Sequence, residues 1–212
     1  MFLTKLVLDP THPQGRRDLA NAYEMHRTLS RVYANGPDTK PARFLWRREY
    51  AGTQSSEENV SVLVQSASAG RWQSLPDKGR YALALYPDKV VPLDRLVEEG
   101  RFYVFRLRCN PTVTRAGKRY GLIREEDQLA WLGRQGNQHG FSLSSARVGR
   151  NERVQFRQQR DGHRITLQVA QFDGLLGVGD PEKFRAALVG GIGHAKALGL
   201  GLLSIAPFRA HD

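Results

Sequence analysis

The sequence predicts an α+β fold built from two consecutive domains of similar element order. Three features favour it: short alternating apolar and polar runs typical of strands, helical periods that follow strands, and a proline-containing segment without a clear period at 87–100. The predicted order in each half is β-α-β-β-α-β, with a loop or short helix as the second helix of the first half. Two ferredoxin-like units are the simplest fold with this order. We expect an N-terminal domain over 1–86, a linker over 87–100 and a C-terminal domain over 101–212.

In the first half, the run 2–9 alternates as a strand does and is followed by prolines. A helix then begins with Asn21 as its N-cap, and Glu24 completes the pattern of a capping box. Apolar residues recur at helical spacing until the segment 35–37, Asn-Gly-Pro, ends the helix. Further strands are predicted over 43–50, 60–65 and 81–86, with a loop around Gly70 and Trp72 before the last of them.

In the second half, the alternating run 102–109 predicts a strand and the period over 125–135 predicts a short helix. A strand over 141–148 follows. The dipeptide Asp161-Gly162 then indicates a hairpin between the apolar positions 154–156 and 165–169. Asp180 and Pro181 are a typical cap and first residue for a helix over 181–189. A glycine-rich loop leads to a last strand over 200–206.

The charge of the chain indicates a nucleic-acid partner. Its 212 residues include 32 Lys and Arg against 21 Asp and Glu, a net charge of +11, and 25 of the cations are Arg. Arg grips phosphate with two parallel hydrogen bonds and stacks on bases, whereas Lys is a hydrated point charge. A GC-rich genome would give the same Arg bias. Residues 101–170 carry a net charge of +9, so one third of the chain supplies most of the positive field.

Other features exclude several classes of protein. No apolar run approaches the ~18 residues that a membrane span needs. The N-terminus is too short and too early charged for a signal peptide, and the only cysteine is Cys109. The histidines have no paired ligand spacing, and no carboxylate cluster marks a two-metal nuclease. The six histidines of the chain are His12, His26, His139, His163, His194 and His211. We therefore expect a soluble, cytoplasmic protein without metal or other cofactor.

His26 is the first candidate for chemistry. With Asn21 as N-cap, Tyr23 and His26 lie three residues apart on the helix and within mutual reach, at the margin of its apolar face. The positive potential of the helix N-terminus disfavours imidazolium, so a neutral imidazole could accept a proton near neutral pH. Alternatively, His26 is a boundary histidine that binds a backbone carbonyl.

The glycine-rich segment 190–201 is the second candidate. It follows a predicted helix and precedes a strand, which is the wrong order for a Walker loop or a Rossmann turn. Repeated glycines let backbone amides approach phosphates closely, and Lys196 adds charge. Alternatively, the segment is a tight connection that needs positive φ. The candidate binding residues are Lys196, Gly191, Gly193, Gly199 and Gly201.

Six arginines between 147 and 164 are the third candidate. We interpret them as a basic hairpin rather than a helix, because Asp161-Gly162 interrupts the run and the flanking apolar residues alternate with period two. An arginine-tipped arm can follow the phosphates of an RNA stem, whose end or loop is more open than a regular A-form groove. Alternatively, arginine only protects a solvated edge strand. The arginines are Arg147, Arg150, Arg153, Arg157, Arg160 and Arg164.

Three blocks of the sequence resemble the CasE (Cse3) family of CRISPR-associated endoribonucleases. They are Leu-Thr-Lys-Leu-Val-Leu at 3–8, Tyr-Glu-Met-His-Arg-Thr-Leu-Ser at 23–30, and Lys-Ala-Leu-Gly-Leu-Gly-Leu-Leu-Ser-Ile-Ala-Pro at 196–207. The resemblance follows the whole chain in order. It implies two tandem ferredoxin-like domains and cleavage, without metal, of precursor CRISPR RNA at the base of the repeat stem-loop. It further implies that the protein keeps its product within a type I-E surveillance complex.

The resemblance also implies roles for particular residues. The family's catalytic histidine and tyrosine correspond to His26 and Tyr23, its basic hairpin to the segment from Arg157 to Arg160, and its glycine loop to 191–201. Arg27, within the second matching block, is expected to bind RNA. Two other classes stay open: a noncatalytic RRM-like RNA-binding subunit, although 102–105 lacks the glycines of an RRM strand, and a regulator of duplex DNA, for which no helix-turn-helix or zinc module is visible.

Overall fold

The computed structural model describes residues 1–36, 39–49, 60–76, 80–157 and 164–208. The chain divides into two compact units. Unit 1 comprises Met1–Val91, Phe156–Arg164 and Ala197–Gly199, and unit 2 comprises Pro92–Gln155, Ile165–Lys196 and Leu200–Asp212. A short piece of the C-terminal glycine-rich loop therefore belongs to the N-terminal unit.

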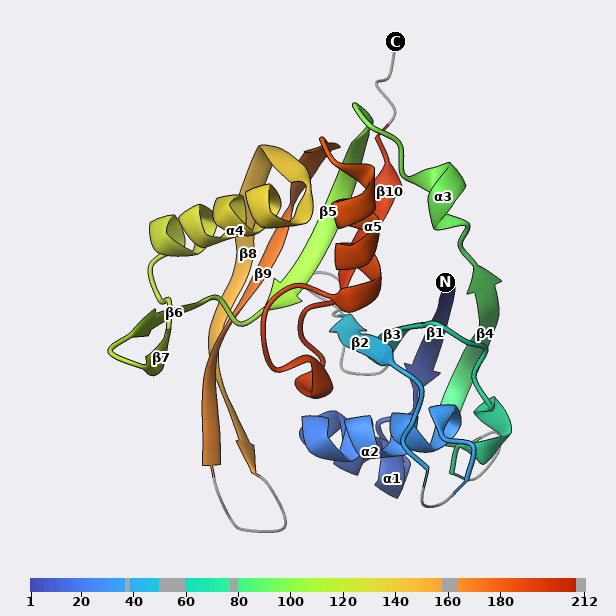
Figure 1. The fold of residues 1–212 in the computed structure, drawn as a ribbon. Coiled ribbons are helices and arrows are strands. Elements are labelled where there is room, and N and C mark those ends of the chain that lie inside the picture. The colour runs from blue at the N-terminus through green and yellow to red at the C-terminus, as the bar shows by residue number, and fades with distance from the viewer. Residues whose placement is uncertain (37–38, 50–59, 77–79, 158–163, 209–212) are drawn as a thin grey trace. The chain divides into compact units, whose positions relative to one another are not determined.

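Unit 1 is a four-stranded antiparallel sheet in the order β2-β3-β1-β4, which is the ferredoxin-like order (Figure 1). The second helix of that fold is reduced to one three-residue turn, as the sequence allowed. The elements are β1 Phe2–Leu8, α1 Pro13–Ala20, α2 Ala22–Tyr33, β2 Phe44–Glu49, β3 Val60–Ser66, η1 Trp72–Ser74 and β4 Ala82–Val90.

The predicted N-cap of α2 is confirmed. The Asn21 side chain accepts a hydrogen bond of 3.0 Å from the Tyr23 amide, so one of the unpaired N–H groups at the helix start is satisfied. Helix α1 was not predicted, because its apolar period is weak. It begins at Pro13, and the His12 imidazole caps it by accepting from the Gly15 amide at 3.3 Å.

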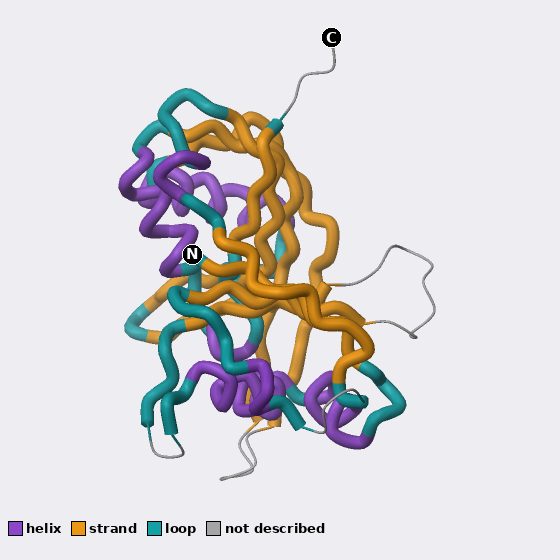
Figure 2. The backbone as a smooth tube through the Cα atoms, turned by 90° about the vertical axis from the view of Figure 1, so that its right-hand side faces the viewer, coloured by secondary structure: helices purple, strands orange, loops and turns teal. Residues whose placement is uncertain are grey.

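Unit 2 has a second antiparallel sheet, in the order β10-β5-β9-β8, and a separate two-stranded hairpin, β6–β7. Helices α4 and α5 lie on one side of the sheet, and Figure 2 shows the helix layer and the strand layer of this unit edge on. The elements are α3 Leu93–Leu96, β5 Phe102–Cys109, β6 Thr112–Arg115, β7 Lys118–Gly121, α4 Glu125–His139, β8 Phe141–Arg157, β9 Arg164–Val178, α5 Pro181–Gly190, η2 Lys196–Leu198 and β10 Leu203–Pro207.

Each unit has its own hydrophobic core between sheet and helices. In unit 1, Leu6, Met25 and Leu29 are fully buried, because the apolar stripe of α2 faces the inward side of β1. In unit 2, Leu132 of α4 and Phe184 of α5 pack against the inward side of β5 and β9. The α+β class with two ferredoxin-like units is therefore confirmed.

Two predicted boundaries are wrong, and one hairpin was not predicted. Strand β4 and helix α3 occupy much of the segment 87–100 that was predicted as a linker. The strand predicted over 141–148 and the first arm of the basic hairpin form one continuous strand, β8, because the polar residues between them are compatible with an exposed edge strand. The hairpin β6–β7 was not predicted. The turn Asp161-Gly162 lies outside the described residues.

Candidate functional site

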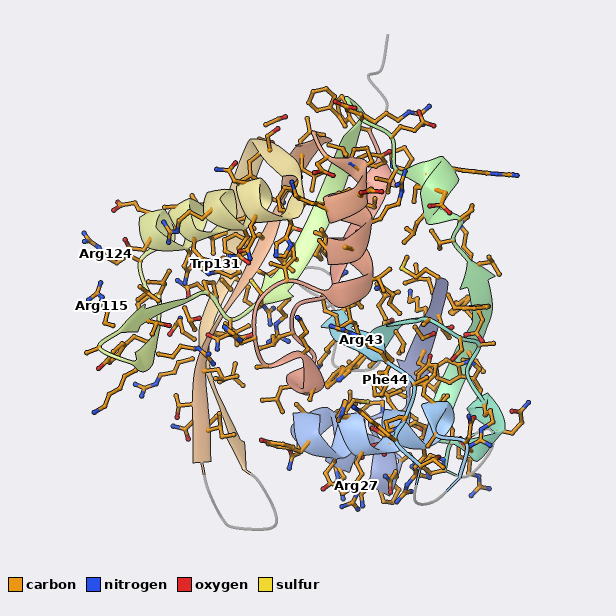
Figure 3. The ribbon with its side chains drawn as sticks, in the orientation of Figure 1. Arg27, Arg43, Phe44, Arg115, Arg124 and Trp131 are labelled. Atoms are coloured by element: carbon orange, nitrogen blue, oxygen red, sulfur yellow. The ribbon has the colours of Figure 1, made fainter. Side chains whose placement is uncertain are left out.

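Helix α2 and strand β2 of unit 1 together fix the side chain of His26. Its imidazole stacks on the ring of Phe44, the first residue of β2, with ring centroids 5.0 Å apart and planes 23° apart. Tyr33, two turns further along α2, stacks on the same ring at 5.0 Å. Figure 3 labels Phe44 where β2 begins, beside α2. Because Phe44 is 8% exposed, it holds the imidazole in one orientation.

The environment of His26 favours its neutral form. Burial lowers the pKa of His26 below its ordinary value of 6.5. The Nδ1 atom is buried and has no hydrogen-bond partner among the described residues. An unpaired buried nitrogen is unusual, and such atoms occur at functional sites. The alternative that His26 binds a backbone carbonyl through Nδ1 therefore has no support within the described part of the chain.

The first turn of α2 carries the other candidates of this helix. Tyr23 is half-buried at the N-terminus of α2. Arg27 is 56% exposed at its side chain, and its guanidinium lies 3.6 Å from the buried carboxylate of Glu24. Arg17 of α1 approaches the same carboxylate at 3.2 Å. Glu24 therefore orients two exposed arginines at the end of the helix that carries Tyr23 and His26.

Strand β2 also fixes part of the glycine-rich loop. The indole N–H of Trp46 donates to the carbonyl of Ala197 at 3.3 Å. Gly199 has a φ of +76°, and a Cβ built there would lie 2.7 Å from the Trp46 ring. Phe44 and Trp46 are two residues apart on one strand and so lie on one face of it. The Ala197–Gly199 segment and His26 are thus both held by side chains of that face.

The predicted glycine cradle is only partly available to a phosphate. The amides of Gly191 and Gly201 donate to the carbonyls of Ala187 and Arg108 at 2.7 Å each, so they close the loop instead. Gly193 has a φ of +84°, and a Cβ built there would lie 3.5 Å from the ring of Trp131 (labelled in Figure 3). The amides of Gly193 and Gly199 remain the candidates.

Positive charge gathers around Lys196 in unit 2. Burial and then the Lys196 ammonium lower the pKa of His139. Burial, Arg119 and Lys196, in that order, lower the pKa of His194. Both histidines therefore favour their neutral form, and an anion bound near Lys196 would reverse part of this effect.

The arginines of the predicted basic hairpin lie on the long strands β8 and β9. Arg147, Arg150 and Arg153 are exposed on β8, which is an edge strand of its sheet. Arg157 is the last residue of β8 and Arg164 the first of β9, so the two strands do form the arms of a hairpin. Arg160 lies outside the described residues. No group of three or more His, Cys, Asp or Glu among the described residues could hold a metal ion.

Phe44 and Trp46 were missed by the sequence analysis, although the structure gives them the two central contacts of the site. The run Phe-Leu-Trp at 44–46 indicates only a buried strand, and nothing in it shows which distant residues its rings contact. A lone aromatic residue at the start of a strand is most often part of the core.

The chain is similar to known proteins over nearly its whole length. A family model described as "CRISPR associated protein" matches residues 1–207. The chain belongs to this CRISPR-associated protein family. It is 40% identical, over 98% of its length and 100% of the relative's, to the CRISPR-associated endoribonuclease Cse3 of Thermus thermophilus. The CRISPR system Cascade subunit CasE of Escherichia coli is 31% identical over 98% of this chain and 100% of its own.

The solved structures agree with this assignment. A structure of CRISPR endoribonuclease Cse3 bound to 19 nt RNA superimposes with a TM-score of 0.86 at 40% identity, covering 98% of this chain and 100% of the other. The resemblance to the CasE (Cse3) family is therefore confirmed over the whole chain. No helix within the described residues of this family member is long and apolar enough to cross a membrane.

Proposed function

We propose that the chain is an endoribonuclease that cleaves precursor CRISPR RNA at the base of the repeat stem-loop and stays bound to its product. Two observations support RNA cleavage. A relative 40% identical to this chain is named a CRISPR-associated endoribonuclease, and a similar solved structure is that of a CRISPR endoribonuclease bound to RNA. The position that carries the family's histidine, His26, is a desolvated imidazole stacked on Phe44. This second observation carries the proposal.

The reaction is a transesterification. The 2′-hydroxyl next to the scissile phosphate attacks phosphorus, the bond from phosphorus to the 5′-oxygen breaks, and a 2′,3′-cyclic phosphate and a 5′-hydroxyl result. RNA supplies the nucleophile itself, so the reaction needs only proton transfer and charge stabilisation and no metal ion. We assign the general base to His26, because a lowered pKa leaves the imidazole neutral at pH 7.

The other residues bind or orient the RNA. Tyr23 positions the ribose or donates a hydrogen bond to the leaving oxygen. Lys196 and the amides of Gly193 and Gly199 stabilise negative charge on the phosphate. The cations that contact the RNA backbone are Arg27, Arg150, Arg153, Arg157 and Arg160. One relative is a Cascade subunit, which supports assembly of this chain into a type I-E surveillance complex.

The test is single-turnover cleavage of an end-labelled repeat stem-loop by wild type and His26→Ala. The loss of a general base reduces the rate at least ~10²-fold while RNA affinity stays the same. Ser30→Ala is the matched control: among the described residues its hydroxyl donates only to the carbonyl of His26, at 2.7 Å, one turn along the same helix. It is expected to cleave like wild type. Stem-loop binding by wild type without cleavage would instead favour the noncatalytic RNA-binding subunit.

A further inference from the structure

The hairpin β6–β7 presents an exposed basic tip that the proposed mechanism does not use. Arg115 pairs with Lys118 next to the turn, and Val113 pairs with Tyr120 further back. The turn residues Ala116 and Gly117 have φ values of 47° and 75°, as in the tight turns that suit the twist of two strands. Figure 1 shows the hairpin projecting at one edge of unit 2, near the start of α4.

The hairpin carries uncompensated positive charge. Residues 112–121 contain Arg115, Lys118 and Arg119 and no acidic residue, and Arg124 follows shortly after. None of these four cations forms an ion pair within the described part of the chain. Figure 3 shows Arg115 and Arg124 pointing outward from this edge. The acidic residues 125–127 lie in the first turn of α4, where they complement the positive end of that helix.

One face of the hairpin combines two cations with an aromatic ring. Directly paired residues share a face of a two-stranded ribbon, and successive pairs lie on opposite faces, so every second pair lies on the same face. Arg115, Lys118 and Tyr120 therefore lie on one face, and Tyr120 is 51% exposed. Arg119 lies on the opposite face, consistent with its effect on the pKa of His194.

The base of the hairpin is fixed to the body of unit 2. The fully buried amide of Gln128 in α4 donates to the Leu122 carbonyl at 2.8 Å and to Asn151 of β8 at 3.0 Å. The Asn151 amide in turn donates to the Ile123 carbonyl at 2.9 Å. Gly121 lies so close to Gln168 of β9 that a Cβ would be 2.7 Å from that side chain. The base of the hairpin is thus held in place before any ligand arrives, which lowers the entropy cost of binding.

We propose that this face of the hairpin binds unpaired RNA that flanks the repeat stem-loop. Arg115 and Lys118 contact consecutive phosphates, and one base stacks on Tyr120. A basic surface with an exposed aromatic ring is the usual composition of sites for single-stranded nucleic acid. An acidic protein surface would use the two cations and leave the ring without a role. The identity of the RNA rests on the proposed function; binding of a flank does not require that the chain cleaves it.

The test measures affinity for the stem-loop alone and for the same stem-loop with ten unpaired nucleotides on the 5′ or the 3′ side. Arg115→Gln/Lys118→Gln is compared with Arg95→Gln/Arg134→Gln, which removes the same charge from exposed positions elsewhere in unit 2. We expect the hairpin double variant to weaken binding of a flanked RNA only. For that RNA, the slope of log affinity against log salt concentration is expected to fall in magnitude by about 1.4, because each contact with a single-strand phosphate contributes roughly 0.7.

Variants of Tyr120 distinguish base stacking on the ring from the contacts of the two cations with phosphate. Tyr120→Ala is expected to weaken binding of the same flanked RNA roughly 5- to 100-fold, and Tyr120→Phe, which keeps the ring, to bind like wild type. Wild-type affinity of the hairpin variants for both flanked RNAs would overturn the proposal and leave a protein partner as the use of the charge. An equal loss on the bare stem-loop would also overturn it. Cleavage is followed in the same samples, so failure of the proposed nuclease activity is seen separately from failure of flank binding.

Discussion

Replacement of Gly199 by alanine is expected to destabilise the protein, because it disturbs the packing of the glycine-rich loop against Trp46. The new methyl group would lie 2.7, 2.8 and 3.0 Å from three carbon atoms of the indole ring. Real Cβ atoms do not approach ring carbons that closely, so either the ring or the loop must move. Trp46 is only 5% exposed and has little room to do so.

The size of the effect follows from two costs. An alanine at φ +76° costs about 1–2 kcal/mol because its Cβ crowds the following carbonyl. Forcing a methyl group into a packed site costs about 1–3 kcal/mol more. Gly100 has the same φ of +76°, but nothing lies within 4 Å of its Cβ position. Gly100→Ala therefore carries the first cost alone and is the matched control.

The assay is equilibrium unfolding in urea followed by circular dichroism. With a slope of about 2–3 kcal/mol/M, the extra cost of Gly199→Ala lowers the midpoint by roughly 0.3–1.5 M relative to Gly100→Ala. In a Trp46→Leu background the ring is absent, so Gly199→Ala should cost no more than Gly100→Ala does. This double-mutant cycle measures the coupling between residues 199 and 46 directly.

Equal midpoints for Gly199→Ala and Gly100→Ala would refute the packing argument. So would an unchanged cost of Gly199→Ala in the Trp46→Leu background, because the clash would then not involve the indole.

Three further predictions concern His26 and the basic hairpin formed by β8 and β9. Because burial lowers the pKa of His26, the acidic limb of the pH profile of kcat/KM is expected to lie below pH 6.5. Phe44→Ala exposes the imidazole and is expected to move this limb to higher pH. A limb that Phe44→Ala leaves unchanged would count against His26 as a general base held by Phe44. The pKa of His26 is lower in the folded protein than in the unfolded chain, so folding is favoured most above pH 6.5. The contribution of His26 to the free energy of unfolding is lost as the pH falls below 6.5 through its folded-state pKa. Replacing Arg157 and Arg160 together by Gln is expected to reduce the magnitude of the slope of log stem-loop affinity against log salt by about 1.8, because two phosphate contacts are lost. An unchanged slope would indicate that these arginines lie on a solvent-exposed edge strand and do not contact RNA.

The fold could be predicted largely because its signals are local. The Asn21 cap, the apolar period of α2 and the alternation of β5 each depend on neighbours in sequence, and the order of such elements was enough to indicate two ferredoxin-like units. Helix α1 escaped prediction because its cap is a histidine and its residues are mostly polar. The length of β8 escaped because an edge strand tolerates polar residues that otherwise indicate a loop.

The site was predictable only where a motif could be matched. The cap and the spacing made His26 and Tyr23 candidates, but spacing alone favoured a structural histidine, and only the family resemblance made His26 the expected catalytic residue. The stacking of His26 on Phe44 joins residues 18 positions apart, and the bond from Trp46 to Ala197 joins residues 151 positions apart. Contacts of that separation depend on tertiary packing, which one sequence does not reveal. The engagement of the Gly191 and Gly201 amides within the loop was hidden for the same reason.

The proposed metal-independent transesterification is tested most directly with wild-type protein, excess chelator and a repeat stem-loop in which the nucleotide before the scissile phosphate is 2′-deoxy. Under these conditions the all-ribose RNA is expected to be cut at the base of its stem to give a 2′,3′-cyclic phosphate, whereas the deoxy RNA is expected to bind equally well but not to be cut. Cleavage of the deoxy RNA at the same bond, or loss of all cleavage in chelator, would contradict this mechanism.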